Sequence, residues 1–213
     1  GDYDADGVSG SVILSQVFKD IGLDFEAYLP NREEEGYGLN KEAIKKFSED
    51  KVSLIITVDC GISNKEEVEL ANNLNIDVII TDHHSIPEEV PNALGIIHPG
   101  YDEKYPFKLL AGGGVAFKVA QALLKDKENS NLEKWLLDFV AISTVADMVP
   151  LIGENRTLVK YGLVVLSKTK NLGLKKIFEV SGIDINKIDA FTIGWKIAPR
   201  INAAGRMEHA NSA

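Results

Sequence analysis

The residues best suited to chemistry in this 213-residue chain are aspartates and histidines that stand together in short stretches. The first stretch, GDYDADG, alternates Asp2, Asp4 and Asp6 with other residues and ends in a glycine. Carboxylates in this pattern can bind a hard cation, and they can equally cap the N-terminus of a following helix. An EF-hand calcium loop is the weakest interpretation, because such a loop ends in a bidentate Glu and Ile13 stands at that position.

Two further groups come directly after apolar runs. Asp59 ends the run VSLIITVD, and Asp82, His83 and His84 end the stretch IDVIITDHH. In an open parallel sheet, ligands gather beyond the carboxyl ends of the strands. Adjacent histidines beside carboxylates suit a transition metal, and a carboxylate can orient an imidazole from behind. We therefore expect these side chains to meet at one edge of a sheet.

A fourth candidate is Asp147, which lies in the apolar stretch STVADMVP. An unpaired charge is costly in such surroundings, so either a metal ion or a buried salt bridge must compensate it. The candidate ligands are then four carboxylates and one imidazole: Asp4, Asp6, Asp59, His83 and Asp147. This set is too rich in oxygen for structural zinc and suits Mn²⁺ or Mg²⁺. Several carboxylates could share two cations, the arrangement that serves in-line phosphoryl displacement.

The apolar pattern predicts the elements that must position these residues. Helices are expected over 8–21, over 41–49 with Asn40 as cap, and over 63–74 with a capping box from Ser63 to Glu66; strands are expected over 23–29, 52–59, 76–82 and 94–98. Further helices are expected over 114–125, 132–143, 155–168, 173–181 and 187–195. We therefore predict an α/β fold with a central, mainly parallel sheet flanked by helices and a helix-rich C-terminal half.

Composition and charge exclude several classes of protein. No apolar run is long enough to span a membrane, and the single cysteine cannot form an internal disulfide, which fits a cytoplasmic location. The net charge of −9 argues against a surface coated in basic charge, but it is unevenly spread. Residues 1–154 hold 13 basic and 28 acidic residues, whereas residues 155–207 hold 10 and 3. A cation site beside a polyanion site would give this split, and so would a solvated lysine-rich helix face.

Three other features have a structural interpretation beside a functional one. The run Gly112-Gly113-Gly114 before a helix could bind an anion or form a tight packing turn. Cys60 is expected to pack as a small apolar side chain rather than act as a nucleophile. His98 has no partner that the sequence identifies. A P-loop NTPase is not supported, because the GxxxxGK[ST] motif is absent.

Four stretches, GDYDADG, VDCG, TDHH and STVADMVPL, resemble in their order the four motifs of the DHH phosphoesterase superfamily. PNREEEGYGL, AGGGVAFK, ENRTLVKYGL and IAPRINAAGRM are similar, more narrowly, to the RecJ family of single-strand-specific exonucleases. The resemblance covers nearly the whole chain. It implies a metal-dependent 5′-to-3′ exonuclease of DNA repair and recombination, which hydrolyses phosphodiester bonds of single-stranded DNA with two Mn²⁺ or Mg²⁺ ions.

The resemblance also implies the roles of the candidate residues. Those that match metal ligands of the family are Asp4, Asp6, Asp59, His83 and Asp147. Asp59, His83 and His84 would be catalytic, with Asp59 bridging the metals and His84 at the phosphate. Asp2 and Asp82 would stand behind the ligands.

The basic part of the chain supplies the candidates for substrate binding. They are Arg200, Asn202 and Arg206 in the segment around Ala203-Ala204-Gly205, and Arg156 on an earlier helix. Arginine can grip phosphate through two hydrogen bonds, although Pro199 and Gly205 would also suit a purely structural turn. Arg156 with Lys160 could equally be a solvated face, and Arg32 and Tyr37 are weaker candidates.

The chain departs from the family pattern at both ends. The His that usually precedes the position of Gly1 is missing, and the family's DHHA1 domain would lie beyond Ala213. We therefore interpret residues 1–213 as the DHH catalytic domain of a longer protein, with single-stranded DNA, a DHHA1 domain in cis, a single-strand-binding protein and a helicase as partners, and no membrane. The alternatives are a DHH phosphodiesterase for short oligonucleotides or cyclic dinucleotides, a manganese pyrophosphatase, and a non-catalytic RecJ-like replication scaffold.

Overall fold

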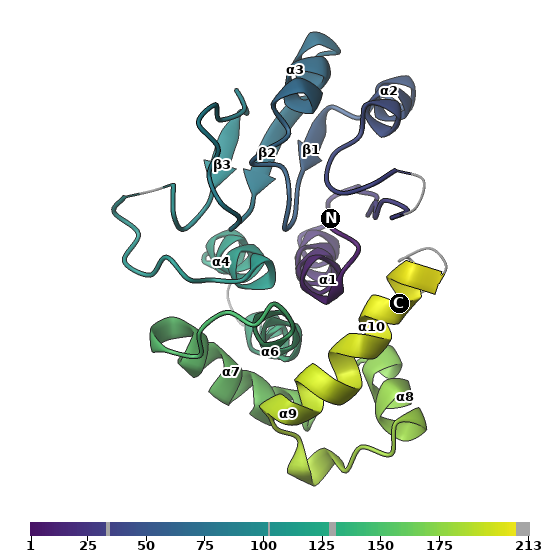
Figure 1. Ribbon diagram of the computed structural model, residues 1–213, viewed down its shortest axis with the longest axis vertical. Helices are drawn as coiled ribbons and strands as arrows, with labels where there is room; N and C mark the ends of the chain where they lie inside the picture. The colour runs from purple at the N-terminus through teal and green to yellow at the C-terminus, as the bar shows by residue number, and fades with distance from the viewer. Residues whose placement is uncertain (33–34, 102, 128–130, 208–213) are drawn as a thin grey trace.

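A three-stranded parallel sheet forms one end of the molecule (Figure 1). The computed structural model describes residues 1–32, 35–101, 103–127 and 131–207, without the side chains of residues 206 and 207. The strands are β1 (Leu54–Ile56), β2 (Asp77–Thr81) and β3 (Gly95–Ile97), in the order β1-β2-β3. Ile55 pairs with Val78, and Ile79 pairs with Gly95. The predicted parallel sheet is confirmed, although each strand is shorter than the apolar run that predicted it.

One face of the sheet is covered by α2 (Lys41–Glu49) and α3 (Lys65–Asn73). Val78 and Ile80 alternate along β2 with the exposed Asp77 and the half-buried Ile79, and they point to this face. They form a small core with apolar residues of both helices, among them Ile44. Asn40 caps α2 as predicted, because its side chain accepts a hydrogen bond from the amide of Ala43 at 2.7 Å.

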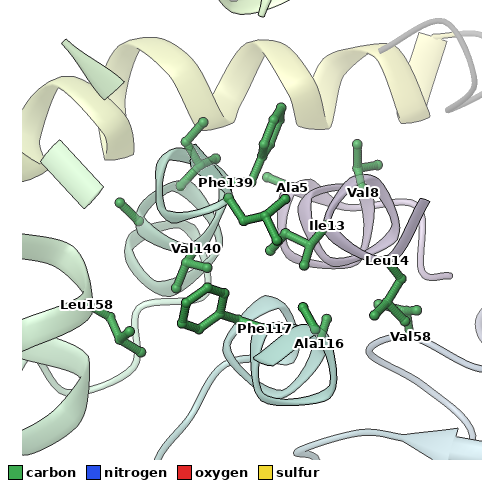
Figure 2. Close-up of a cluster of buried hydrophobic side chains, with 14 of the residues drawn as sticks. Ala5, Val8, Ile13, Leu14, Val58, Ala116, Phe117, Phe139, Val140 and Leu158 are labelled. Atoms are coloured by element: carbon green, nitrogen blue, oxygen red, sulfur yellow. The ribbon is translucent and has the colours of Figure 1, made fainter. Parts of the chain in front are cut away.

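Two helices lie between the sheet and the rest of the molecule: α1 (Ala5–Asp20) and α4 (Gly112–Leu124) (Figure 1). Gly10 allows their close approach. A Cβ at this position would meet Val58 Cγ1 at 2.6 Å and the Cα of Gly113 at 3.3 Å. Apolar side chains of α1, of α4 and of α6 (Leu137–Ala146) form the larger core. Figure 2 shows part of this core, including Ile13 and Phe117.

The C-terminal half is helical, as predicted. It contains α5 (Leu132–Trp135), α6, α7 (Gly153–Leu166), α8 (Leu172–Val180), the 3₁₀ helix η1 (Ile185–Lys187), α9 (Ala190–Thr192), the π-helix η2 (Ile193–Ile197) and α10 (Ala198–Met207). In Figure 1, α10 runs diagonally from α9 back toward the N-terminus of the chain. No helix in the described part of the chain combines the length and the apolar character needed to cross a membrane. The predicted fold class is confirmed.

Two predictions of local structure in the first half are wrong. Residues 23–29 form no strand, and residues 23–27 are all exposed, so they lack the half-buried environment that stabilises one. The N-cap of α3 is Asn64 rather than Ser63, and the expected capping box does not form. The Glu66 carboxylate instead pairs with Lys41 Nζ at 2.5 Å, which joins α2 to α3.

Two predicted helices of the second half are interrupted. The segment 132–143 divides at the fully buried Leu136 into α5 and α6. The segment 187–195 is divided among η1, α9 and η2. Asp189 starts a new helix there, because its carboxylate and the Thr192 side chain form a capping box.

Candidate metal centre

Asp59 lies three residues beyond β1, in a left-handed backbone conformation with φ of +60°. Its amide donates to the carbonyl of Thr81 at 3.0 Å, which continues the pairing with β2. The next turn is fixed by Thr57, whose hydroxyl donates to the carbonyl of Cys60 at 2.7 Å. The Asp59 side chain is 2% exposed, so the strand end delivers a carboxylate into the interior.

The two histidines follow β2 and are positioned by Asp82. One Asp82 oxygen accepts from the amide of Ile62 at 2.9 Å. The other oxygen accepts from the amide of His83 and lies 2.7 Å from His84 Nδ1. As a result, His83 Nε2 faces Asp59 Oδ1 at a distance of 3.1 Å. The meeting expected at the carboxyl ends of the strands is therefore present.

Asp6 reaches the same point from the helical side. His83 Nε2 lies 3.6 Å from Asp6 Oδ2 and 3.7 Å from Asp147 Oδ2. Asp6 comes from the first turn of α1, and Asp147 is the C-cap residue of α6. Asp4 is the N-cap of α1, and its Oδ1 accepts from the amides of Asp6 and Gly7 at 2.9 and 3.0 Å. Asp4 therefore caps a helix and also belongs to the acidic cluster.

The glycine run at the start of α4 binds the Asp6 carboxylate. Asp6 Oδ2 accepts from the amide of Gly112 at 2.7 Å, and Oδ1 accepts from the amide of Gly113 at 2.7 Å. Ser143 of α6 donates a third hydrogen bond to Oδ1 at 2.5 Å. The glycine run thus binds an anion at a helix N-terminus and is also a packing turn. Both interpretations hold together because the anion is the Asp6 side chain of the protein itself.

Ligand atoms in the cluster fall into three groups whose members lie within 4.8 Å of one another: Asp59, His83 and His84; Asp6, His83 and Asp147; Asp2, Asp4 and Asp59. Asp59 belongs to two groups, so it stands between two possible ion positions. The sequence predicts Asp2 behind the ligands; in the structure its ligand atom lies within 4.8 Å of those of Asp4 and Asp59, and the residue is 4% exposed.

Burial and mutual repulsion perturb the carboxyl groups of the cluster. Burial, with repulsion from Asp6 and Asp4, raises the pKa of Asp59 well above its usual value. The same causes raise the pKa of Asp147 to about 7. Burial and the charge of Asp4 raise the pKa of Asp2 to about 6. Several carboxylates thus share one site, and among the described side chains only His83 and His84 form ion pairs with them.

The histidines differ in their electrostatic environment. Burial lowers the pKa of His83, which favours the neutral imidazole that a metal requires. The hydrogen bond to Asp82 raises the pKa of His84. Burial alone would raise the pKa of Asp82, but hydrogen bonds from the His84 ring and from the amide of Ile62 bring it below its usual value. His84 is therefore the member of the pair that can carry a proton.

Several polar atoms of the cluster fit a bound cation. Asp2 Oδ1, Asp59 Oδ1 and His83 Nε2 are buried and have no hydrogen-bond partner. Buried polar atoms are nearly always satisfied, so three such atoms in one cluster indicate a ligand that binds there. The donors are carboxylate oxygens and imidazole nitrogen, which suit Mn²⁺ and Mg²⁺.

The residues predicted to bind substrate are less closely gathered. Asn202 Oδ1 accepts from the amide of Ala5 at 2.7 Å, so α10 contacts the start of α1 beside the cluster. Arg200 Nη1 donates to the carbonyl of Lys196 at 2.7 Å and is exposed. Arg156 is exposed on α7, and no contact joins it to a ligand residue within the part of the chain that the structure describes. The side chain of Arg206 lies outside the described residues.

Two further aromatic and basic candidates lie near the cluster. The Tyr37 hydroxyl donates to the carbonyl of Asp59 at 3.0 Å, and its ring contacts His84 edge-on. The Arg32 guanidinium lies over the ring of Tyr3, 5.4 Å from its centre. Tyr37 therefore supports the turn at Asp59, a contact that the GYG stretch alone did not indicate.

Comparison with known proteins identifies the family. Residues 1–144 match the model of the DHH family, N-terminal domain. The chain belongs to the DHH family. This DHH chain is 46% identical over 214 residues to the single-stranded-DNA-specific exonuclease RecJ of Bacillus subtilis, a match that covers 100% of the chain and 27% of the relative. It is 40% identical to the RecJ of Escherichia coli, over 98% of the chain and 38% of that protein.

Solved structures of DHH relatives share its arrangement. A crystal structure of exonuclease RecJ bound to manganese matches with a TM-score of 0.89 and 37% identity, over 99% of this chain and 53% of that one. RecJ of Thermus thermophilus in complex with Mn²⁺ matches with a TM-score of 0.84 and 34% identity, over 99% of this chain and 30% of that one. The predicted resemblance to RecJ is confirmed. The DHH chain spans well under half the length of the curated relatives named above.

Proposed function

We propose that this chain is the catalytic DHH domain of a metal-dependent exonuclease, which hydrolyses phosphodiester bonds of single-stranded DNA from the 5′ end. The observation that carries the proposal is the group of buried, unpartnered ligand atoms of Asp59, His83 and Asp2. Its support is the similarity to RecJ proteins, two of which have been crystallised with manganese. Interpreting residues 1–213 as one DHH domain belongs to the same proposal.

The residues that would hold two Mn²⁺ or Mg²⁺ ions divide around Asp59. On one side are Asp6, His83 and Asp147, next to Asp59 through the 3.1 Å approach of His83 Nε2, and on the other are Asp2 and Asp4. Two such ions, when bound, make water a nucleophile at neutral pH and stabilise the charge that develops at phosphorus. The raised pKa values of the carboxyl groups fit this arrangement, because positive charge would replace the protons that they otherwise retain.

His84 is suited to a different task. Its ring is partly exposed, and the Asp82 carboxylate behind it stabilises the protonated form. A protonated imidazole can donate a hydrogen bond to a phosphate oxygen or protonate the oxygen that leaves. Asp82 would thus hold the ring orientation and the proton at His84, while the neutral His83 remains a ligand.

Substrate would approach from the side of α10. Asn202 anchors this helix to α1, Arg200 lies two residues before it, and Arg206 lies four residues after it. We assign these arginines to the phosphate backbone, with Arg156 as a more distant contact. The single-strand-binding protein, the helicase and the DHHA1 domain in cis stay predictions from the resemblance, and the cytoplasmic location stays a prediction from the cysteine content.

The test is an assay of the full-length protein on long single-stranded DNA labelled at either end, on the matched duplex and on dinucleotides. We expect mononucleotides released from the 5′ end of the single strand, in the presence of Mn²⁺ and not of a chelator. Asp59→Asn should lower the rate at least about a hundredfold. A wild-type rate in this variant, or activity in chelator, would refute the proposal. Cleavage confined to dinucleotides would favour a phosphodiesterase for short substrates.

A further inference from the structure

His98 is a buried histidine directly after β3, and neither the fold nor the proposed chemistry has so far used it. Its side chain is bonded at both ring nitrogens. Nδ1 accepts a hydrogen bond from the amide of Gly100 at 2.9 Å, and Nε2 lies 2.8 Å from the carbonyl oxygen of His84. The ring therefore bridges the loop after β3 and the loop after β2.

These two partners determine the state of the ring. A backbone amide can only donate, so Nδ1 must present its lone pair to Gly100. A backbone carbonyl can only accept, so Nε2 must carry the proton that points to His84. The neutral imidazole with its proton on Nε2 satisfies both contacts, whereas a doubly protonated ring would place a proton against the Gly100 amide.

The contact falls on the loop that carries the candidate metal ligands. Asp82 holds the amides of His83 and His84 from one side, at 2.7 and 3.2 Å. His98 holds the carbonyl of His84 from the other side. The peptide on each side of His84 is therefore fixed, and with it the direction in which the neighbouring His83 ring leaves the backbone.

We propose that His98 is a positioning residue for the metal centre, whose Nε2–H holds the His84 carbonyl so that the His83 imidazole stays aimed at Asp59. The proposal rests on the proposed function, since it takes the cluster to be a metal site. Partners of this kind, one step removed from the metal, typically change metal affinity by about 10- to 100-fold when they are lost.

Two substitutions separate the hydrogen bonds of the ring. His98→Gln places an amide nitrogen near the position of Nε2 and can still donate to the His84 carbonyl. His98→Asn is shorter and can accept from Gly100 but does not reach His84. A cavity of about 120 Å³ beside His98 leaves room for either side chain without overpacking.

The experiment measures three quantities on the full chain: the Kd for Mn²⁺ by calorimetry, amide hydrogen exchange over residues 82–85 without metal, and the melting temperature. For His98→Asn we expect a Kd about tenfold higher and faster exchange in this loop. For His98→Gln we expect both quantities to stay close to wild type. An equal loss of melting temperature in the two variants, with unequal Kd, would separate positioning from packing.

Two outcomes overturn the proposal: a wild-type Kd together with wild-type exchange in His98→Asn, or an equal rise of Kd in both variants. If the wild-type protein binds no Mn²⁺, the proposed metal centre fails. The exchange measurement still decides the contact in that case, because unchanged exchange in His98→Asn would show that His98 does not hold the loop.

Discussion

The candidate metal centre has a helical side and a sheet side, and each contributes one almost fully buried carboxylate. Asp6, on α1, is 1% exposed and accepts three hydrogen bonds from α4 and α6. Asp59, beyond β1, is 2% exposed, and its Oδ1 accepts no hydrogen bond, although His83 Nε2 lies 3.1 Å away. Equal burial thus has opposite consequences. The protein compensates the Asp6 charge itself, whereas it leaves the Asp59 charge for a cation to compensate.

The largest expected effect tests the helical side of this comparison. Asp6→Asn should lower the free energy of unfolding of the metal-free protein by about 3 kcal/mol, because the new NH₂ group faces donors at Gly112, Gly113 or Ser143. Urea denaturation in the presence of chelator measures it. Ser143→Ala, which removes one of the three donors, is the matched control and should cost about 1 kcal/mol. A loss below about 1 kcal/mol for Asp6→Asn would contradict the structural role of Asp6.

The second prediction uses two adjacent glycines, one of which contacts the helical side of the cluster and the other the sheet side. A Cβ on Gly113 would meet Ser143 Oγ at 2.5 Å, whereas a Cβ on Gly112 would meet Asp59 Oδ1 at 2.5 Å. Both Gly→Ala variants should lose about 2 kcal/mol of stability through overpacking, although alanine is the better helix former.

Only the Gly112 variant should also weaken Mn²⁺ binding markedly in calorimetry, because it displaces the carboxylate that the two ion positions share. Gly194→Ala is the control, since its Cβ would meet Val145 Cγ1 at an ordinary 3.8 Å. Equal Mn²⁺ affinities in the Gly112 and Gly113 variants would remove the distinction between the two sides.

The two sides also differ in how far the sequence predicted them. Asp59 and His83 follow long apolar runs, which identify the strands from the sequence alone. Because the carboxyl ends of parallel strands meet at one edge of the sheet, the proximity of the two residues could be predicted. The hydrogen bond of Ser143 to Asp6 joins residues 137 positions apart, and that of Ala5 to Asn202 joins residues 197 apart. No pattern in a single sequence encodes such pairings, because packing between distant helices determines them.

Asp2 and His98 show the same limit at the sheet side. The alternating aspartates suggested a cation loop, but which of them face one another depends on the pairing of Asp2 with Val58 beside β1. His98 ends the predicted strand 94–98 and precedes a proline, and only the register of β3 against β2 brings it to His84.

The third prediction concerns the sheet side directly. Asp59→Asn should raise the stability of the metal-free protein at about pH 8 by about 1–2 kcal/mol, because it removes a buried charge that lacks compensation. Asn suits this test better than Ala, since Asp59 has a φ of +60° that Asn tolerates. Excess Mn²⁺ should reverse the order, because only the wild type gains binding energy. If the metal-free variant is instead less stable than the wild type, the protein itself compensates the Asp59 charge, as it does for Asp6.

The smallest effect is the pH dependence of the wild type. Burial raises the pKa of Asp147 to about 7 and of Asp2 to about 6, from an ordinary 3.8. Between pH 4 and 7 the folded state therefore binds more protons than the unfolded chain at these groups, so stability increases as the pH falls. His84, whose pKa is raised by its bond to Asp82, acts in the same direction, and His83, whose pKa burial lowers, acts against it below about pH 6.5.

We expect the metal-free protein to gain about 1 kcal/mol between pH 8 and pH 6 in urea denaturation with chelator. Asp147→Asn should flatten this slope, because the variant has no carboxyl group to protonate there. With saturating Mn²⁺ the slope should change sign, since protons then compete with the cation for the same oxygens. If the metal-free protein instead loses stability between pH 8 and pH 6, the carboxylates of the cluster stay charged without a cation. The protein would then compensate the charges of Asp59 and its neighbours by its own contacts, as it does for Asp6.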